Sequence, residues 1–507
     1  MDEKYIVAID LGTFKISLAV ALQDGTDTRL VYYKETPANG MKSSRILTEL
    51  RVVKQLKQAI QDAEEILGIK ITCAVVGMPR FYIKTEENEA RIDDRDADSY
   101  ITAAEINELK SFAQDSYPIA PENQNTDAVY GAIAQSFSTE EEFQLVEEDI
   151  VGMSSKVLEG SFKIFIGAKA ALNRIDKVMR SVELVPVKKY FQPKYTADTV
   201  LYPSEMNNGV ALIDLGGGCT SVSVFYKNVL RHYASIPFGG MNVTRDIQTE
   251  SNISLSLAEN LKLAFGACLP DKLQNMSEKQ LLIKGGNGDM DRRLAVKYLS
   301  EIITAREEEI IRAMLYEIGR SGFADKLQSG VVITGGGAMM TNLGNFITEL
   351  SGYKVRIGRP RMTGIINACT GATSPSASAV VGMIMAAVNE DVMTCACVKE
   401  DYVKTEDVAK DVAEDEEVVV SAQQEAVGEE GNGQEHTPTD MEHKTGTLPG
   451  IMTEEEISRQ GGKNKKKKDS GSSSRFIVWT NKLKKKFNAG CDTMLDLLEE
   501  DKDEKEE

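Results

Sequence analysis

A chain of 507 residues, 42% of them hydrophobic, is too long for one hydrophobic core and predicts at least two folded domains. Its formal net charge of −19 argues against nucleic-acid binding. Seven cysteines without a Cys-x-x-Cys pair, together with three histidines, predict reduced thiols and no zinc site.

The sequence predicts neither a signal peptide nor a membrane-spanning segment. The charged residues 2–4 precede a strand instead of a long apolar region, so no signal peptide is expected. The longest apolar run, 379–388, is too short to cross a bilayer.

The first predicted element is a β-hairpin with a glycine turn. Residues 5–9 are an apolar strand, 10–13 read Asp-Leu-Gly-Thr, and 16–20 are the returning strand. Glycine lets backbone N–H groups converge on an anion, and a carboxylate at a strand end can hold a hard cation through water. This pattern predicts a magnesium–phosphate site, the alternative being an ordinary β-turn. The candidate residues are Asp10 for the metal and Gly12, Thr13 and Lys15 for the phosphates.

Apolar residues at helical spacing over 46–67, namely Leu50, Val53, Leu56, Ile60 and Ile66, predict a helix. An apolar run over 71–76 predicts a further strand. Residues 84–160 then interrupt the pattern with an acidic segment and with Thr102-Ala103-Ala104-Glu105, which predicts a capping box at the start of a helix. We interpret 84–160 as an inserted subdomain, the alternative being a surface elaboration. Ile106, Leu109 and Phe112 are expected to share one face of the inserted helix.

A second hairpin repeats the first, with Asp214 in the place of Asp10. Residues 210–213 are an apolar strand, three glycines turn the chain, and 220–225 return as an alternating strand. The repeat suggests a duplicated domain that holds one ligand from both sides. The candidate residues are Asp214 for the metal and Gly216, Gly217, Gly218, Cys219 and Thr220 for the phosphates.

Two further glycine segments follow the second hairpin. The first precedes a helix on which Glu259 and Lys262 share a face, because they are three residues apart. The alternative for this pair is an exposed salt bridge. The second glycine segment directly follows a predicted strand that begins at residue 331. The glycine segments contain Gly239 and Gly240, and Gly335, Gly336, Gly337 and Ala338.

The composition changes near residue 399. Residues 399–460 hold 18 acidic and 5 basic residues, which predicts a disordered tether over 399–470. Within 471–490, apolar residues at helical spacing oppose basic residues, which predicts an amphipathic helix on an anionic membrane. The alternatives are a nucleic-acid or partner-binding helix, and 491–507 is an acidic tail. The apolar stripe is Phe476, Trp479, Leu483 and Phe487, and the basic residues are Lys482, Lys484, Lys485 and Lys486.

In this order, the three glycine motifs resemble those of the actin, Hsp70 and sugar-kinase superfamily. Its phosphate motifs match 6–17 and 210–224, and its adenosine motif matches 331–338. The resemblance implies an α/β, actin-like (ribonuclease-H-like) duplicated ATPase fold with ATP and Mg²⁺ between two related halves. It also implies that Gly239, Gly240, Glu259 and Lys262 approach the nucleoside. The implied catalytic residues are Asp10, Asp214 and Gln192, the last of which would orient water unless it is a surface glutamine.

The insert makes the resemblance more specific. Tyr100-Ile101-Thr102, Gly152-Met153 and Leu158-Glu159 are similar to the insert of the FtsA family of bacterial cell-division proteins. The hydrophobic-His-Pro pattern usual in that insert is replaced here by Ala134-Gln135-Ser136-Phe137. The resemblance covers residues 4–388. It implies these parts: 1–83 with 161–200 (subdomain 1A), 84–160 (1C), 201–244 with 306–398 (2A), and 245–305 (2B).

The family resemblance also implies a function. Such a protein attaches the FtsZ ring to the cytoplasmic side of the cell membrane at the division septum, and it is a recruiting protein with at most a weak ATPase activity. Its implied partners are the acidic FtsZ C-terminal tail, further copies of itself in an actin-like filament, anionic lipids and other divisome proteins, with no nucleic acid. Subdomain 2B would receive the tail with Arg306, the alternative being a solvated arginine. The rival classes are an Hsp70-like chaperone, a kinase and a rod-shape filament protein.

We expect Trp479, the one tryptophan of the chain, to enter the interface of anionic membranes, because apolar burial and lysine attraction act together there. Its fluorescence should shift to the blue with anionic vesicles and much less with neutral ones. Trp479→Glu, or reversal of the three lysines 484–486 to Glu, should release the protein. No shift with either kind of vesicle would contradict the membrane helix.

Overall fold

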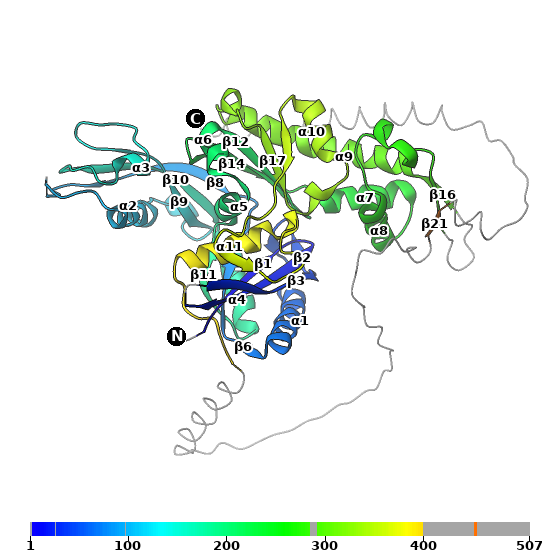
Figure 1. The fold of residues 1–507 in the computed structure, drawn as a ribbon, viewed down its shortest axis with the longest axis horizontal. Coiled ribbons are helices and arrows are strands. Elements are labelled where there is room, and N and C mark those ends of the chain that lie inside the picture. The colour runs from blue at the N-terminus through cyan, green and yellow to red at the C-terminus, as the bar shows by residue number, and fades with distance from the viewer. Residues whose placement is uncertain (1–2, 26, 97, 284–291, 399–450, 454–507) are drawn as a thin grey trace, which may run out of the picture. The chain divides into compact units, whose positions relative to one another are not determined.

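The computed structural model describes residues 3–25, 27–96, 98–283, 292–398 and 451–453 (Figure 1). The predicted amphipathic helix at 471–490 and the acidic tail lie outside these residues, as does the predicted tether except for strand β21 (Ile451–Thr453). Within the described ranges, no helix has both the length and the apolar character needed to cross a bilayer.

Two mixed β-sheets with the same strand arrangement form the body of the described chain (Figure 1). In each sheet, three strands that are consecutive in the chain pair antiparallel with one another. On its other side, the first of these three strands pairs parallel with a later strand, and that later strand pairs parallel with the edge strand. The first sheet has the order β11 (Val185–Tyr190), β7 (Cys73–Gly77), β1 (Lys4–Leu11), β2 (Lys15–Asp24), β3 (Asp27–Pro37) and β19 (Ile365–Asn367). The second has the order β14 (Val229–Ile236), β13 (Thr220–Tyr226), β12 (Val210–Leu215), β17 (Val331–Thr334) and β18 (Val355–Ile357). The predicted duplicated α/β fold is confirmed.

Helices pack on these sheets and on the insert, and short strand pairs complete the described fold. The helices are α1 (Glu49–Leu67), α2 (Ala103–Asp115), α3 (Glu147–Ile150), α4 (Lys169–Ser181), α5 (Gln192–Val200), α6 (Pro203–Asn208), α7 (Gly240–Ser251), α8 (Leu255–Phe265), α9 (Val296–Arg320), α10 (Leu343–Ser351) and α11 (Ser378–Asn389). The short antiparallel pairs are β4 (Met41–Lys42) with β5 (Arg45–Ile46), β6 (Ile69–Ile71) with β20 (Ala396–Val398), and β15 (Gln280–Ile283) with β16 (Arg292–Ala295).

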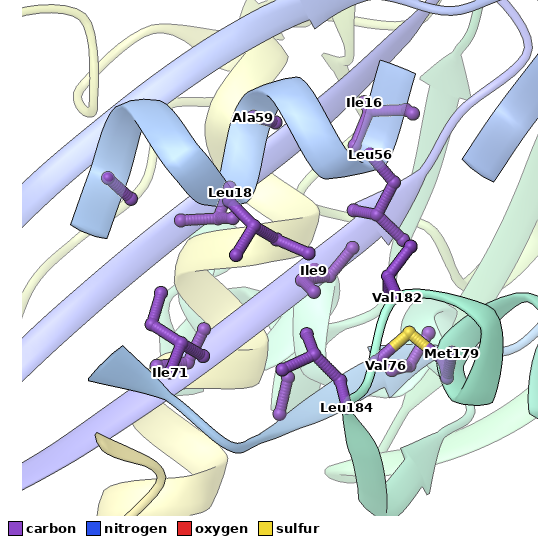
Figure 2. Packing of buried hydrophobic residues seen from close by; sticks show 14 of the residues in the cluster. Ile9, Ile16, Leu18, Leu56, Ala59, Ile71, Val76, Met179, Val182 and Leu184 are labelled. Carbon is purple, nitrogen blue, oxygen red and sulfur yellow. The ribbon is translucent and has the colours of Figure 1, made fainter. Parts of the chain in front are cut away.

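The first sheet is buried on both faces because side chains alternate along its strands. On one face, Ile9 and Leu18 pack with Leu56 of α1 and Met179 of α4 (Figure 2). On the other face, the side chains that alternate with these along the strands, such as that of Ala8, pack with α11. This two-sided core holds the ends of β1 and β2 in place.

The buried face of α1 differs from its prediction at both ends. Leu56 and Ile60 are buried as expected, whereas Leu50 and Ile66 are exposed. The residues that face the sheet follow the helical period of 3.6 residues and include Ala63. Leu50 lies six residues before Leu56 and Ile66 six residues after Ile60, so this period places both on the solvent side.

The insert forms a separate antiparallel sheet in the order β8 (Lys84–Ile92), β10 (Leu158–Ala168) and β9 (Asp127–Ser138), with α2 packed on it. Its central strand, β10, continues past the predicted end of the insert at residue 160. The insert sheet touches the second half, because Gln135 Nε2 donates to the Leu230 carbonyl oxygen at 3.0 Å and Arg231 NH1 donates back to the Gln135 carbonyl oxygen at 3.0 Å.

The predicted capping box at the start of α2 is present. The Glu105 backbone N–H donates to Thr102 Oγ1 at 3.2 Å, and the Thr102 N–H donates to Glu105 Oε2 at 2.8 Å. Of the residues expected to share a face, Ile106 and Leu109 are buried, whereas Phe112 is exposed and Ala113 is buried in its place.

Helix α11 lies close to the backbone of α5 at Gly382. A Cβ at this position would collide with the Tyr195 carbonyl oxygen and lie 2.7 Å from its carbonyl carbon. Because α5 begins with Gln192 and α11 packs on the first sheet, this contact sets the position of Gln192 relative to that sheet.

We expect Gly382→Ala to lower the free energy of unfolding by about 1–3 kcal/mol, since the backbone of α5 cannot rotate away from the added methyl group. Gly319→Ala in α9 is the matched control. Nothing lies within 4 Å of its added Cβ, and it should stabilise by about 0.4–1 kcal/mol through the unfolded chain. Urea unfolding followed by circular dichroism measures both, and equal stabilities of the two variants would contradict the close contact.

Candidate functional site

Asp10 and Asp214 occupy equivalent positions in the two halves. Each is the next-to-last residue of the first strand of its sheet, and each lies opposite a serine of the returning strand, Ser17 or Ser221. Both aspartates are 8% exposed. The repeated hairpin therefore presents one buried carboxylate from each half.

The predicted glycine motifs come together around these aspartates. A Cβ at Gly217 would meet the Phe14 side chain, and one at Gly218 would meet Thr13, so the two hairpin turns touch. A Cβ at Gly335 would collide with Asp214 Oδ1, and one at Gly337 would lie 2.8 Å from the Leu215 Cβ. Glycine at these positions permits the close approach of three chain segments.

The N-terminus of α7 closes over the second turn. The backbone N–H groups of Gly240 and Met241 donate to the carbonyl oxygens of Gly216 and Gly217 at 3.0 and 2.8 Å. A Cβ at Gly239 would collide with the Gly216 carbonyl oxygen. Gly239 and Gly240 thus lie directly against the predicted phosphate turn. In the same turn Cys219 is buried, and Thr220 Oγ1 donates to the Phe238 carbonyl oxygen at 2.9 Å.

Glu259 and Lys262 lie beside this helix start and are mostly buried. Lys262 Nζ is 2.8 Å from Glu259 Oε2, and it also donates to the Gly240 carbonyl oxygen at 3.0 Å and to Thr244 Oγ1 at 2.9 Å. The alternative of an exposed salt bridge is therefore wrong. The pair connects α8 to the glycine turn through Gly240.

Gln192 reaches the first aspartate. Its Nε2 donates to Asp10 Oδ1 at 2.6 Å, and the residue is 2% exposed. Gly77, at the end of β7, leaves the room that the Gln192 side chain occupies. The alternative of a surface glutamine is wrong.

Arg80 is a site residue that sequence reasoning missed. Its NH1 donates to Asp214 Oδ2 in a buried ion pair between the two halves. Burial raises the pKa of Asp214, with the Arg80 charge opposing this effect. In the sequence, Arg80 is marked only by its place just after the strand predicted over 71–76. The parallel pairing of β7 with β1 brings the residues that follow Gly77 to the same sheet edge as Asp10.

Two predicted charges have partners elsewhere in the chain. Lys15 Nζ pairs with Glu35 and donates to the Ser376 carbonyl oxygen at 3.3 Å. Arg306 Nε lies 2.5 Å from Asp246 Oδ2, and its NH1 pairs with Glu309. An acidic partner at Arg306 has to compete with two carboxylates of this chain.

Glu307 follows Arg306 in α9 and points into the interior. It is 3% exposed, and its Oε2 accepts no hydrogen bond from any described residue. Burial raises its pKa to about 7, against the lowering effect of the charges of Lys262 and Arg306. Glu307 is therefore a buried carboxylate on which the charges of both Lys262, at the predicted nucleoside contact, and Arg306, at the predicted partner contact, act.

One hollow lies away from the glycine motifs, where the insert sheet meets the second half. Its volume is about 590 Å³, and its lining mixes the charges of Glu148, Asp149, Lys227 and Arg231. Size alone does not mark a site, and this hollow contains none of the residues predicted to bind nucleotide, metal or partner. The site is better located by the convergence of the glycine turns, the two aspartates and Arg80.

Comparisons with known proteins agree with this architecture. The sequence model of the family "Cell division protein FtsA" matches residues 211–382. FtsA of Neisseria meningitidis serogroup B is 29% identical over 390 residues, which are 76% of this chain and 91% of that protein. FtsA of Pseudomonas aeruginosa is 28% identical over 359 residues, 70% of this chain and 83% of that protein.

Among solved structures, a chain of the PilM-PilN type IV pilus biogenesis complex has a TM-score of 0.52 at 12% identity. The match covers 76% of this chain and 98% of that chain. At this identity the likeness shows the fold alone, and that fold is the actin-like α/β fold.

We expect Glu307 to make stability depend on pH. Between the ordinary carboxyl pKa of 4.5 and the raised value of about 7, the folded state keeps a proton that the unfolded state has lost. The free energy of unfolding should therefore fall as pH rises through this window and stay lower above it.

Glu307→Gln keeps the size of the side chain and removes this titration. It should stabilise the protein at pH 8, by up to about 3 kcal/mol, and have little effect at pH 5. Scanning calorimetry at both pH values measures Tm, with Glu308→Gln, which pairs with Arg312 nearer the surface, as the control. The same Tm change at pH 5 and pH 8 would contradict the assignment.

Proposed function

Because the chain belongs to the FtsA family of cell-division proteins, we propose that it is an ATP-binding, actin-like protein that tethers the FtsZ ring to the inner face of the cytoplasmic membrane. One observation carries the ATP-binding part of the proposal. The glycine turns of the two halves touch each other, and the third glycine segment lies against Asp214 at the end of the second hairpin's first strand.

The residues at these contacts suit a nucleotide. Glycines in both turns remove the side chains that would keep phosphate oxygens from backbone N–H groups. Gly335 lies against Asp214 and Gly337 against Leu215, and the Glu259–Lys262 pair lies beside Gly240. Phosphates at the turns and a nucleoside toward α8 would use all the predicted groups except Lys15, which is paired with Glu35.

The residues also suit Mg²⁺. This ion usually binds one or two carboxylates and completes its shell with water and substrate phosphates. Asp10 and Asp214 supply that number, and the described residues contain no group of three or more acidic, histidine or cysteine side chains that would form an all-protein cage. When bound, the ion neutralises part of the phosphate charge.

The touching turns require a rearrangement on binding. Thr13 and Phe14 fill the space over Gly218 and Gly217 in this structure. A nucleotide between the turns therefore has to move them apart or turn these side chains aside. The Gln192 amide holds Asp10 in place during this change, because α5 is fixed by its contact with α11.

The remaining parts of the proposal rest on the family and on the sequence. The amphipathic helix predicted at 471–490 would attach the protein to anionic lipids at the septum, and the tether would let it reach them. The small subdomain around α7 to α9 would receive the FtsZ tail, and polymerisation into a filament would add the effect of many weak anchors. Other divisome proteins would bind to the same membrane-bound filament.

We expect Asp214→Asn to weaken Mg·ATP binding by about tenfold or more, because one of two metal-organising carboxylates is lost. Fluorescence anisotropy with a labelled ATP analogue measures the affinity. Asp325→Asn, which removes the same charge at an exposed position of the second half, is the control and should bind as the wild type does. Unchanged affinity in a folded Asp214→Asn protein would argue against the nucleotide site.

A further inference from the structure

We infer that Arg80 is a phosphate-binding residue of this cleft. Its guanidinium pairs with Asp214 in the nucleotide-free protein, and it binds the terminal phosphates of a nucleoside di- or triphosphate when one enters. This inference rests on the proposed nucleotide site and assigns to it a second, permanent cation beside Mg²⁺.

The position of Arg80 places it between the halves. It follows β7 in the first half, and the carboxylate with which it pairs belongs to β12 in the second. Its NH2 lies 3.3 Å from the point that a Cβ at Gly216 would occupy, so the guanidinium rests on the glycine turn predicted to hold phosphates. A phosphate bound by that turn lies within reach of the guanidinium.

The backbone of Arg80 is held from both sides. Its N–H donates to Ser44 Oγ at 3.1 Å in the first half, and its carbonyl oxygen accepts a hydrogen bond from the Tyr233 hydroxyl in the second. These anchors fix the start of the side chain and leave its end to choose between anions. Arg80 is therefore placed in advance of a ligand.

The hydrogen bonds of Arg80 are incomplete. Guanidinium has five donors, yet Nε is buried and donates to no described residue. A buried unpaired donor is costly, and phosphate oxygens match the planar arrangement of guanidinium donors. A terminal phosphate would supply the missing acceptor.

The charges of the cleft also favour this role. Asp10 and Asp214 bring two buried carboxylates to a place where a nucleotide adds more negative charge. Arg80 offsets part of that charge without dissociating. Nucleotide binding should therefore keep part of its strength when Mg²⁺ is removed.

The test compares ADP and ATP affinities of the full chain in Mg²⁺ and in EDTA for the wild type, Arg80→Gln and Arg80→Lys. The wild type should keep measurable binding in EDTA. Arg80→Gln should lose about 10- to 100-fold in nucleotide affinity in EDTA and less in Mg²⁺. The ratio of its affinity in Mg²⁺ to its affinity in EDTA should therefore be larger than that of the wild type. Arg80→Lys should keep a ratio near that of the wild type. Arg45→Gln, which removes an exposed arginine charge near Phe81, is the matched control and should change neither affinity.

The outcomes separate this inference from the proposed function. A wild-type protein that binds no nucleotide in Mg²⁺ overturns both. If Arg80→Gln weakens nucleotide binding equally in Mg²⁺ and in EDTA, Arg80 serves only as a structural ion pair between the halves. That result overturns this inference and leaves the proposed function standing. Should Arg80→Gln fail to fold, the wild type decides the question, because complete loss of its binding in EDTA also overturns the inference.

Discussion

The burial of one carboxylate at the strand end of each half is the constraint on which the site depends. Asp10 and Asp214 lie where water is largely excluded, so each needs a partner that offsets the loss of hydration. Gln192 meets this need with a hydrogen bond and Arg80 with an ion pair. Both partners come from segments that hold the two halves together, and charge compensation and domain closure are therefore coupled.

The glycines serve the same constraint from the backbone side. Gly77 makes room for Gln192, and Gly335 makes room for the Asp214 carboxylate. In the first hairpin, Thr13 and Phe14 rest on the glycines of the second. A ligand that separates these turns would change the contact between the halves, and this provides a physical route by which nucleotide occupancy can affect filament contacts in the proposed function.

The second half adds a link between this site and the region proposed for a ring protein. Lys262 contacts Gly240 at the glycine turn, and its charge also acts on Glu307 in α9. The next residue along α9, Arg306, is paired with Asp246 of α7. The predicted nucleoside contact, the buried carboxylate and the proposed partner contact thus lie along one connected set of helices.

The sequence by itself determined the repeated hairpins, the glycine motifs, the insert with its capping box and the composition change at 399, because each depends on local spacing or residue type. It did not determine which residues meet across the halves. Arg80 carried no motif, and it became a site residue because parallel pairing brings β7 beside β1. The Gln192–Asp10 bond, the exposure of Leu50 and Phe112, and the pairing of Lys15 and Arg306 with carboxylates of the chain likewise depend on long-range packing. Local sequence specifies each element, and only tertiary structure decides which charges become partners, because those partners are far apart along the chain.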